Sequence, residues 1–350
     1  MTSAAKPTLH ILQPRPQTTV QDLGRFGFQA LGVPSCGALD PVALRLANRL
    51  VGNAEGTAAL ECRLIGPSFE VQGAPVRLAL AGASASIEID MDGDTRQVPA
   101  WRAVTVPAGA TVRVGALRGS GCAILAVAGG LDLPEVLGSH STDLKGGFGG
   151  HQGRALRADD IIGVNRPPLD GPELELPSPP SLEFAGTLRV VLGPQSDAFT
   201  AEGLATFLDT PYEVSREADR MGMRLQGPAL TFFRGADIVS DGIATGAIQV
   251  PGSGQPIILL ADHQTIGGYA KIATVISADL PAAGRLLPGA AIRFRPVSVH
   301  EAEAARRTLE REVARLIGSM APVREAASID ERALFSANLI SGVVTALDAP

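Results

Sequence analysis

Side chains capable of chemistry gather between residues 237 and 276, in the string DIVSDGIATGAIQVPGSGQPIILLADHQTIGGYAKIATVI. The string alternates short runs rich in β-branched residues with turns rich in Gly and Pro, which is typical of short strands joined tightly. Such a scaffold builds a small-molecule site from polar side chains presented where its strands end. The polar residues at these positions are Ser240, Asp241, Gln249, Gln255, Asp262, His263, Gln264, Thr265, Tyr269 and Lys271.

Two carboxylates in this string are candidates for orienting or deprotonating a substrate. Asp262 directly follows the apolar run IILLA, and Asp241 lies in a Ser-Asp-Gly sequence. A carboxylate so placed can accept the N–H of an amide or take its proton. Each also has a structural interpretation, because Asp before Gly stabilises turns and Asp after a strand caps its end. The sequence leaves both interpretations open.

A cation and several amide groups complete the candidate site. Lys271, which we expect at the start of the strand KIATVIS, can polarise a carbonyl, and Gln264 offers a donor and an acceptor to an amide. The alternatives are an exposed lysine on a strand edge and a glutamine bonded to its own loop. We predict three catalytic residues and four substrate-binding residues: Asp262, Asp241 and Lys271, and Gln264, His263, Tyr269 and Gln249.

The elements around this string indicate a mainly β protein. Residues 58–164 carry short strand patterns separated by turn signals, which favours a barrel or a sandwich. Asp40 and Pro41 predict the start of a helix that ends near Gly52, and residues 196–208 are expected to form another short helix. Residues 300–350 carry two helical patterns, a charged one and a more apolar one over 331–347.

The sequence divides into four parts. We expect a β domain over 1–164, a Pro-rich linker without regular structure over 165–187, a second β domain over 188–299 and a helical tail over 300–350. Short strings recur in the same order in both domains: LIGP and LQGP, DLP and DLP, GRAL and GRLL. This order favours a duplicated β domain whose first copy carries extra loops.

Composition excludes several classes of protein. The formal net charge of −6 gives no electrostatic reason to bind nucleic acid or an anionic membrane. No stretch approaches the length of a membrane span, and the N-terminus lacks the apolar region of a signal peptide. The three cysteines are scattered, so we expect a reduced cytoplasmic protein without disulfides, and we predict no metal site.

Two other polar segments lie in the first half of the chain. The Gly-rich string STDLKGGFGGH carries Asp143, Lys145 and His151, with His140 directly before it, and it could cover a pocket as a lid or contact a partner. Its glycines follow neither of the two nucleotide-binding patterns GxxxxGK[ST] and GxGxxG, so they support nucleotide binding only weakly. Asp22 and Arg25 in QDLGR are expected to bind a ligand or simply to pair with each other.

Several long strings resemble one family closely. They include TTVQDLGRFGFQALGVPSCGALDPVALRLANRLVGN, STDLKGGFGGHQGRALRADD, GPQSDAFTAEG, DRMGMRLQGPAL and the block from residue 240 to 281, and the resemblance covers residues 8–305. The family is that of the C component of 5-oxoprolinase, also described as kinase-inhibitor-antagonist or allophanate hydrolase subunit 2 proteins, within the biotin-dependent carboxyltransferase-like group. His263 stands where the family usually has Arg, which puts a cationic role there in doubt.

This resemblance implies two cyclophilin-like β-barrel domains and, as partners, the 5-oxoprolinase subunits B and A. It implies ATP-dependent cleavage of 5-oxoproline, a cyclic amide, to glutamate, with ATP held by a partner or by this chain. Two alternatives remain. The chain is a carboxyltransferase component that uses carboxybiotin to act on urea or a related amide, or it is a regulatory binder of a kinase-inhibitor-like B component without catalysis of its own.

Overall fold

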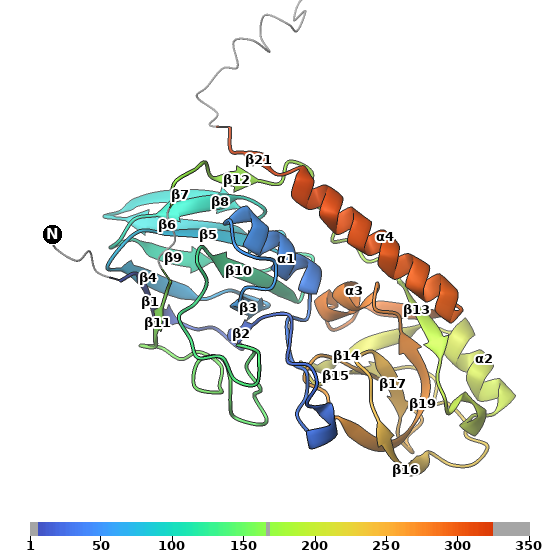
Figure 1. Cartoon of the computed structure of the whole chain (residues 1–350). Helices are drawn as coiled ribbons and strands as arrows, with labels where there is room; N and C mark the ends of the chain where they lie inside the picture. The colour runs from blue at the N-terminus through green and yellow to red at the C-terminus, as the bar shows by residue number, and fades with distance from the viewer. Residues whose placement is uncertain (1–5, 166–168, 325–350) are drawn as a thin grey trace, which may run out of the picture.

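The computed structural model describes residues 6–165 and 169–324, and it is mainly β, as predicted (Figure 1). The first domain consists of two sheets packed face to face. The six-stranded sheet has the order β11 (Ile161–Gly163), β1 (Thr8–Gln13), β4 (Ser68–Gln72), β9 (Thr111–Val114), β6 (Ser86–Met91) and β7 (Asp94–Pro99). The five-stranded sheet has the order β2 (Thr19–Gln21), β3 (Ala59–Arg63), β10 (Cys122–Val127), β5 (Val76–Ala81) and β8 (Ala103–Val106).

Alternation of side chains explains where the first core lies. On β1, Leu9 and Ile11 are fully buried while Thr8 and His10 are partly exposed, so one face of the strand turns inward. On β5 both faces are buried, since Leu78 and Leu80 enter the core between the sheets while Ala79 and Ala81 contact a helix. This helix is α1 (Pro41–Leu50), and the Asp40 side chain caps it by accepting from Ala43 N, as predicted.

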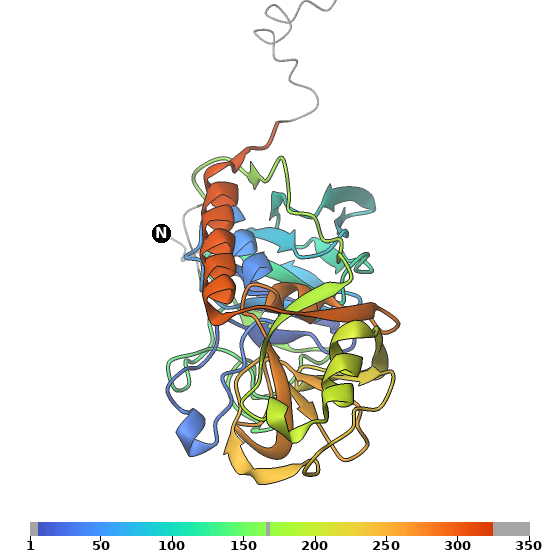
Figure 2. The same cartoon turned by 90° about the vertical axis from the view of Figure 1, so that its right-hand side faces the viewer.

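The C-terminal helix returns to the first domain. Helix α4 (Val299–Gly318) begins with a capping box formed by Ser298 and Glu301, and its buried residues Val313 and Leu316 join the cluster around α1. Figure 2 shows α4 along the side of the first domain, with its start near the second domain. The predicted charged helix is confirmed, whereas the apolar pattern over 331–347 lies outside the described residues.

The second domain is a ring of strands. Its sheet has the order β13 (Thr187–Leu192), β20 (Ala291–Pro296), β14 (Tyr212–Ala218), β15 (Gly222–Gln226), β18 (Ile257–Leu259), β17 (Ala247–Val250), β19 (Ile266–Val275) and β16 (Asp237–Gly242). An additional pairing between β13 and β19 joins the first of these strands to the seventh, which leaves β16 as an attached edge strand. The core inside the ring stacks Phe207 against Phe294, with ring centroids 4.4 Å apart.

Two segments differ in detail from the predictions. Residues 196–208 form a 3-10 turn, η2 (Ser196–Ala198), followed by α2 (Ala201–Asp209), because Thr200 caps the second element by accepting from Gly203 N. The sequence predicts a linker without regular structure, yet strand β12 (Leu174–Glu175) within it pairs with β21 (Ala321–Pro322). The remaining short elements are η1 (Gln29–Leu31) and α3 (Leu280–Arg285).

No helix within the described ranges combines the length and the apolar character that crossing a membrane requires.

One buried arginine joins the two domains. Arg220, which follows β14, donates from Nε and Nη2 to both carboxylate oxygens of Asp262, at 2.8 Å each. It also binds Glu61 on β3 of the first domain, and its Nη2 lies 2.6 Å from the carbonyl oxygen of Gly37. All three charged side chains are at most 5% exposed. Burial by itself lowers the pKa of Arg220, but the two carboxylates outweigh this and raise the pKa, so the guanidinium stays charged.

The Gly-rich loop of the first domain is held by Asp22 and Arg25. Asp22 does not pair with Arg25; its carboxylate accepts hydrogen bonds from the hydroxyls of Ser139 and Ser141 and from the amide N–H groups of Gly24 and His140. The fully buried Arg25 donates to the carbonyl oxygens of residues 136, 139 and 141, and its guanidinium lies 4.8 Å from the ring centroid of Phe148. These contacts anchor the base of the loop, which argues against a lid hinged at that base.

Replacing Arg220 by Met should destabilise the protein strongly. The variant leaves Glu61 and Asp262 buried without their cation, which typically costs about 3–5 kcal/mol of unfolding free energy. Urea denaturation measures this loss. The triple variant Arg220→Met, Glu61→Gln, Asp262→Asn removes the stranded charges and should recover much of it. A single variant that loses less than about 1 kcal/mol would show that the buried charges do not constrain the domains.

Replacing Asp22 by Ala should expose the Gly-rich loop to proteases. Lys145 lies at the exposed tip of the loop, where trypsin can cut once the base opens. We expect cleavage after Lys145 to accelerate by about tenfold or more, since one lost charged hydrogen bond changes a local opening equilibrium by that much. Mass spectrometry of timed digests measures the rate. Glu135→Ala, at an exposed acid of the same region, is the matched control and should leave the rate unchanged.

Candidate functional site

The predicted site residues lie around an interruption along one side of β19. Strand β17 pairs with one side of β19, and on the other side β16 pairs with its beginning and β13 with its end. Lys271 lies between these two stretches, so its backbone N–H has no strand partner there. The side chain of Gln195 takes that place, with Oε1 3.3 Å from Lys271 N. Lys271 therefore lies in the middle of a strand, whereas the sequence predicts a strand that starts after a Gly-Gly turn.

The side chain of Lys271 points away from the core of the ring. Ala270 and Ile272 belong to that core, so Lys271 between them faces the other side, together with its strand partner Gln249. This side chain is covered, since only 4% of Lys271 is exposed. Its Nζ donates to Asp241 Oδ2 at 2.9 Å, and Gln195 Nε2 lies 3.5 Å from the same oxygen.

Asp241 forms the rim of this arrangement. Its side chain is 53% exposed, in contrast to the buried lysine that it binds. The hydrogen bond from the Lys271 ammonium, and next the N–H of Gly242 at 2.8 Å from Oδ1, lower the pKa of Asp241 below its ordinary value. Asp241 is therefore a carboxylate at neutral pH, and Lys271 binds it from the buried side.

Two glutamines extend the polar group inward. Gln264 Nε2 donates to Gln249 Oε1 at 3.4 Å. The buried Nε2 of Gln249 has no acceptor among the described residues, and a buried donor left unpaired costs about 1–3 kcal/mol. A Cβ at Gly267 would lie 2.6 Å from this nitrogen, so only glycine leaves the amide room. We call Gln195, Asp241, Gln249, Gln264 and Lys271 the Lys271 cluster.

His263 and Tyr269, the other predicted substrate contacts, have no hydrogen bond to a side chain of this cluster. His263 is buried, with Nε2 3.1 Å from Thr245 Oγ1 and Nδ1 2.6 Å from the carbonyl oxygen of Gln264. Burial lowers its pKa, so the imidazole is neutral at neutral pH and is committed to its loop. Tyr269 is 43% exposed on β19, opposite Asp237. Substrate binding by either residue stays a prediction.

Asp262 is not part of the Lys271 cluster. The sequence predicts that Asp262, Gln264 and Lys271 share one site, but both carboxylate oxygens of Asp262 are bound by Arg220 at the domain boundary. Asp262 and Arg220 line a hollow of about 240 Å³ with Lys145 and Asp219, and none of the Lys271 cluster lines it. Asp262 does not join Gln264 and Lys271 because the buried guanidinium of Arg220 binds its carboxylate. A catalytic role for Asp262 stays a prediction that its contacts do not favour.

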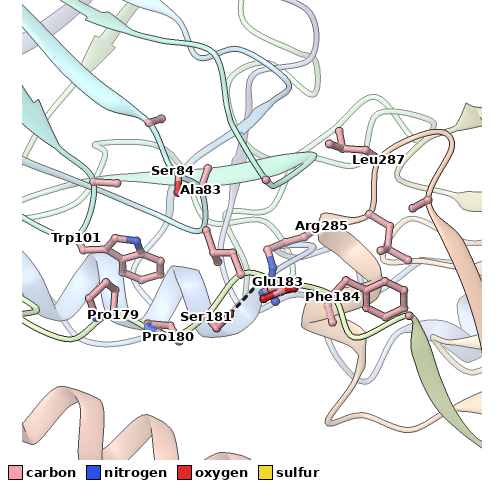
Figure 3. A pocket seen from close by; sticks show the side chains of 18 of the residues that line it. Ala83, Ser84, Trp101, Pro179, Pro180, Ser181, Glu183, Phe184, Arg285 and Leu287 are labelled. Atoms are coloured by element: carbon pink, nitrogen blue, oxygen red, sulfur yellow. Dashed lines mark hydrogen bonds between the residues drawn. The ribbon is translucent and has the colours of Figure 1, made fainter.

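A larger groove of about 980 Å³ lies between the two domains and the linker (Figure 3). Its lining is mostly apolar, with Trp101 and Phe184 as the aromatic side chains and Pro179 and Pro180 from the linker. Arg285 also lines it (Figure 3), and its Nη1 donates to Asp40 Oδ2 of the first domain. No predicted site residue lines this groove. The predicted site residues therefore lie outside this groove.

Sequence reasoning misses two members of the site. Gln195 precedes η2 in the string GPQSD, which reads as an ordinary connection between a strand and a helix. Two adjacent glycines such as Gly267 and Gly268 predict a turn, but in the structure both lie within strand β19. The signal for Gly267 is the alternation around Lys271, which requires that strand β19 begin before the glycines, whereas no local pattern marks Gln195.

The ion pair can be tested through the pKa of Asp241. In the Lys271→Met variant this pKa should rise towards the ordinary value of an aspartate, because the first of its stabilising contacts is gone. In the wild type the pair should persist at neutral pH and separate only as pH falls through the lowered pKa. Carboxyl-detected NMR measures both titrations. Lys145→Met, at an exposed lysine elsewhere, should leave Asp241 unchanged; equal Asp241 titrations in wild type and Lys271→Met would contradict the pairing.

Comparisons with known proteins place the chain in a family. The sequence profile described as "Carboxyltransferase domain, subdomain A and B" matches residues 31–296. The chain is 38% identical to the C component of 5-oxoprolinase from Escherichia coli over 305 residues, covering 87% of this chain and 96% of that protein. It is 36% identical to the protein of the same name from Haemophilus influenzae over 302 residues, covering 86% of this chain and 95% of that protein.

The fold is also that of a module within larger proteins. The crystal structure of the Kluyveromyces lactis urea carboxylase matches with a TM-score of 0.82 and 30% identity, covering 93% of this chain but only 30% of that chain. Fold and sequence therefore agree over nearly the whole described molecule. The chain belongs to the family of the 5-oxoprolinase C component, and its fold is that of subdomains A and B of the carboxyltransferase domain.

Proposed function

We propose that this chain is the C component of an ATP-dependent 5-oxoprolinase, acting with subunits A and B in the cleavage of 5-oxoproline to glutamate. The identity of 38% to a 5-oxoprolinase C component, over 96% of that protein's length, carries this proposal. The Lys271 cluster supports it, because the cluster offers what a planar cyclic amide needs. A lactam presents one carbonyl acceptor and one N–H donor in the same plane.

The geometry suggests how the lactam binds. The unpaired Nε2 of Gln249 donates to the carbonyl oxygen, and the Lys271 ammonium stabilises the negative charge that develops on this oxygen during attack. The Asp241 carboxylate, at the exposed rim, accepts the lactam N–H. Gln264 holds the Gln249 amide in the required orientation. Binding thereby satisfies a donor that is otherwise buried without a partner among the described residues.

The chain's Gly-rich loop does not fit ATP. A nucleotide-binding loop must present free backbone N–H groups to phosphates. Here Lys145 N and Gly146 N donate to the Asp143 carboxylate, Gly147 N to the Asp143 carbonyl oxygen and Gly150 N to that of His140. We therefore assign ATP to a partner, and this chain's part is to bind and polarise the amide.

A second function follows from the family itself. The matched profile is that of a carboxyltransferase domain, and a urea carboxylase shares the fold. In this alternative the Lys271 cluster binds urea, whose carbonyl and N–H groups resemble those of the lactam. Carboxybiotin would come from another polypeptide. Amide binding at the cluster is common to both functions, and the co-substrate distinguishes them.

The decisive assay is glutamate release from 5-oxoproline and ATP by the purified assembly of this chain with subunits A and B. We expect Lys271→Met to lower kcat by about 10²–10³, the usual effect of removing one group that stabilises a developing oxyanion. Gln249→Leu should raise KM and also lower kcat. Lys145→Met is the control and should match the wild type, and size-exclusion chromatography confirms assembly of each variant.

The same assay separates the two functions. Wild-type rates for both Lys271→Met and Gln249→Leu, in intact assemblies, would refute the site. Absence of glutamate release by the wild-type assembly, together with transfer of a labelled carboxyl group from carboxybiotin to urea, would replace the lactamase function by the alternative.

A further inference from the structure

The proposed function leaves one group of the substrate without a partner. The lactam 5-oxoproline carries a carboxylate on the ring carbon next to its nitrogen, and this carboxylate is ionised at neutral pH. The Lys271 ammonium is already bound to Asp241 Oδ2 at 2.9 Å, so this pair has no net charge. When Asp241 accepts the lactam N–H, it also lies close to the substrate carboxylate and repels it. The substrate therefore needs a second cation at the exposed rim of the Lys271 cluster.

Backbone contacts place Arg234 beside the interruption along β19. It stands two residues before Ala236, whose carbonyl oxygen accepts the N–H of Ala270 on β19 at 2.9 Å. The N–H of Arg234 lies 3.4 Å from the carbonyl oxygen of Ala198 in η2. The N–H of Ala198 in turn donates to the carbonyl oxygen of Gln195 at 3.0 Å. The backbone of Arg234 is thus held next to both β19 and the turn that carries Gln195.

The side chain of Arg234 is a cation without a carboxylate partner. It is exposed, and it forms no ion pair with any other described residue. Among the described residues, Arg216 and Arg295 are also exposed and form no ion pair, but they lie on β14 and β20, which do not pair with β19. Arg234 is therefore the cation of this kind whose backbone adjoins the Lys271 cluster.

The neighbouring Phe233 places an apolar surface beside this cation. The Cζ of Arg234 lies 5.8 Å from the centroid of the Phe233 ring, and Phe233 is 70% exposed. A guanidinium at this distance is attracted to the aromatic ring, which keeps the two side chains together. The lactam ring has two methylene groups away from its amide, and their burial against an aromatic ring is favourable. The two side chains thus match a small ring that carries an acid.

We propose that Arg234 binds the carboxylate of 5-oxoproline and makes the Lys271 cluster selective for lactams that carry an acid. The inference rests on the proposed function, because urea has no carboxylate for Arg234 to bind. The planar guanidinium donates two parallel N–H bonds to a carboxylate, which a lysine ammonium cannot do. The bound lactam places its amide at the Lys271 cluster and its acid at Arg234, so one residue distinguishes acidic from neutral amides.

The test is the steady-state kinetics of glutamate release from 5-oxoproline and ATP by the assembly of this chain with subunits A and B. Arg234→Met should raise KM by about 10- to 100-fold, the usual effect of losing hydrogen bonds between charged groups. The kcat should change little, because the carboxylate is bound equally in the ground state and the transition state. Arg234→Lys keeps the charge without the bidentate geometry and should give an intermediate KM.

The neutral lactam 2-pyrrolidone separates binding of the acid from binding of the ring. It is 5-oxoproline without the carboxylate, so its inhibition constant against 5-oxoproline should be the same in the wild type and in Arg234→Met. Arg216→Met removes an exposed arginine from β14 and should match the wild type with both compounds. An unchanged KM of Arg234→Met, or an equal weakening of 5-oxoproline and 2-pyrrolidone, would overturn the inference.

Calorimetric titration of the same assemblies with 5-oxoproline, without ATP, separates this inference from the function on which it rests. If the wild type releases glutamate and Arg234→Met binds 5-oxoproline with the wild-type affinity, the role of Arg234 is wrong and the function stands. If the wild type binds 5-oxoproline without releasing glutamate, and Arg234→Met weakens this binding but not that of 2-pyrrolidone, Arg234 recognises the acid and the lactamase function fails. Absence of 5-oxoproline binding by the wild type would overturn both.

Discussion

A buried guanidinium group ties the two domains together at their boundary. Arg220 binds a carboxylate from each domain and a backbone carbonyl of the loop between β2 and α1, all with almost no exposure to water. Two carboxylates so deeply buried are tolerable only when a cation lies between them. Glu61 is further committed, because it also accepts the backbone N–H of Leu39 at 2.7 Å. The middle of β3 and the chain just after β14 must therefore meet at one point.

The Lys271 cluster arises from a different constraint: buried backbone N–H and C=O groups need hydrogen-bond partners. Strand β13 ends where the chain must leave the ring, and β16 joins β19 only further along. The intervening backbone N–H takes a side-chain oxygen from Gln195 instead. This replacement brings an amide next to Lys271 and Asp241. The cluster is thus partly a product of completing the sheet.

Much of the architecture follows from local sequence, and the tertiary partners do not. Asp40 and Pro41 predict the start of α1, and the Ser298 box belongs to a helix that the charged pattern predicts. Asp262 looks like any carboxylate after an apolar strand, since its partner Arg220 lies 42 residues away. Lys271 and Asp241 are both predicted as site residues, because both are polar residues in one short region of strands and turns, and the structure pairs them. Gln195 comes from 76 residues away, and no local pattern marks it.

The return of α4 to the first domain has a mechanical consequence. Two segments of chain, the linker and α4, connect the second domain to the first, and both are anchored on the first domain. Glu175 of the linker forms a β-bridge with Arg102, and α4 packs on α1. A domain joined by one connecting segment can rotate about that segment. Two connecting segments that are both anchored on the first domain restrict this rotation. Opening the boundary would require β12 and β21 to separate or α4 to detach. The two domains should therefore unfold together as one cooperative unit.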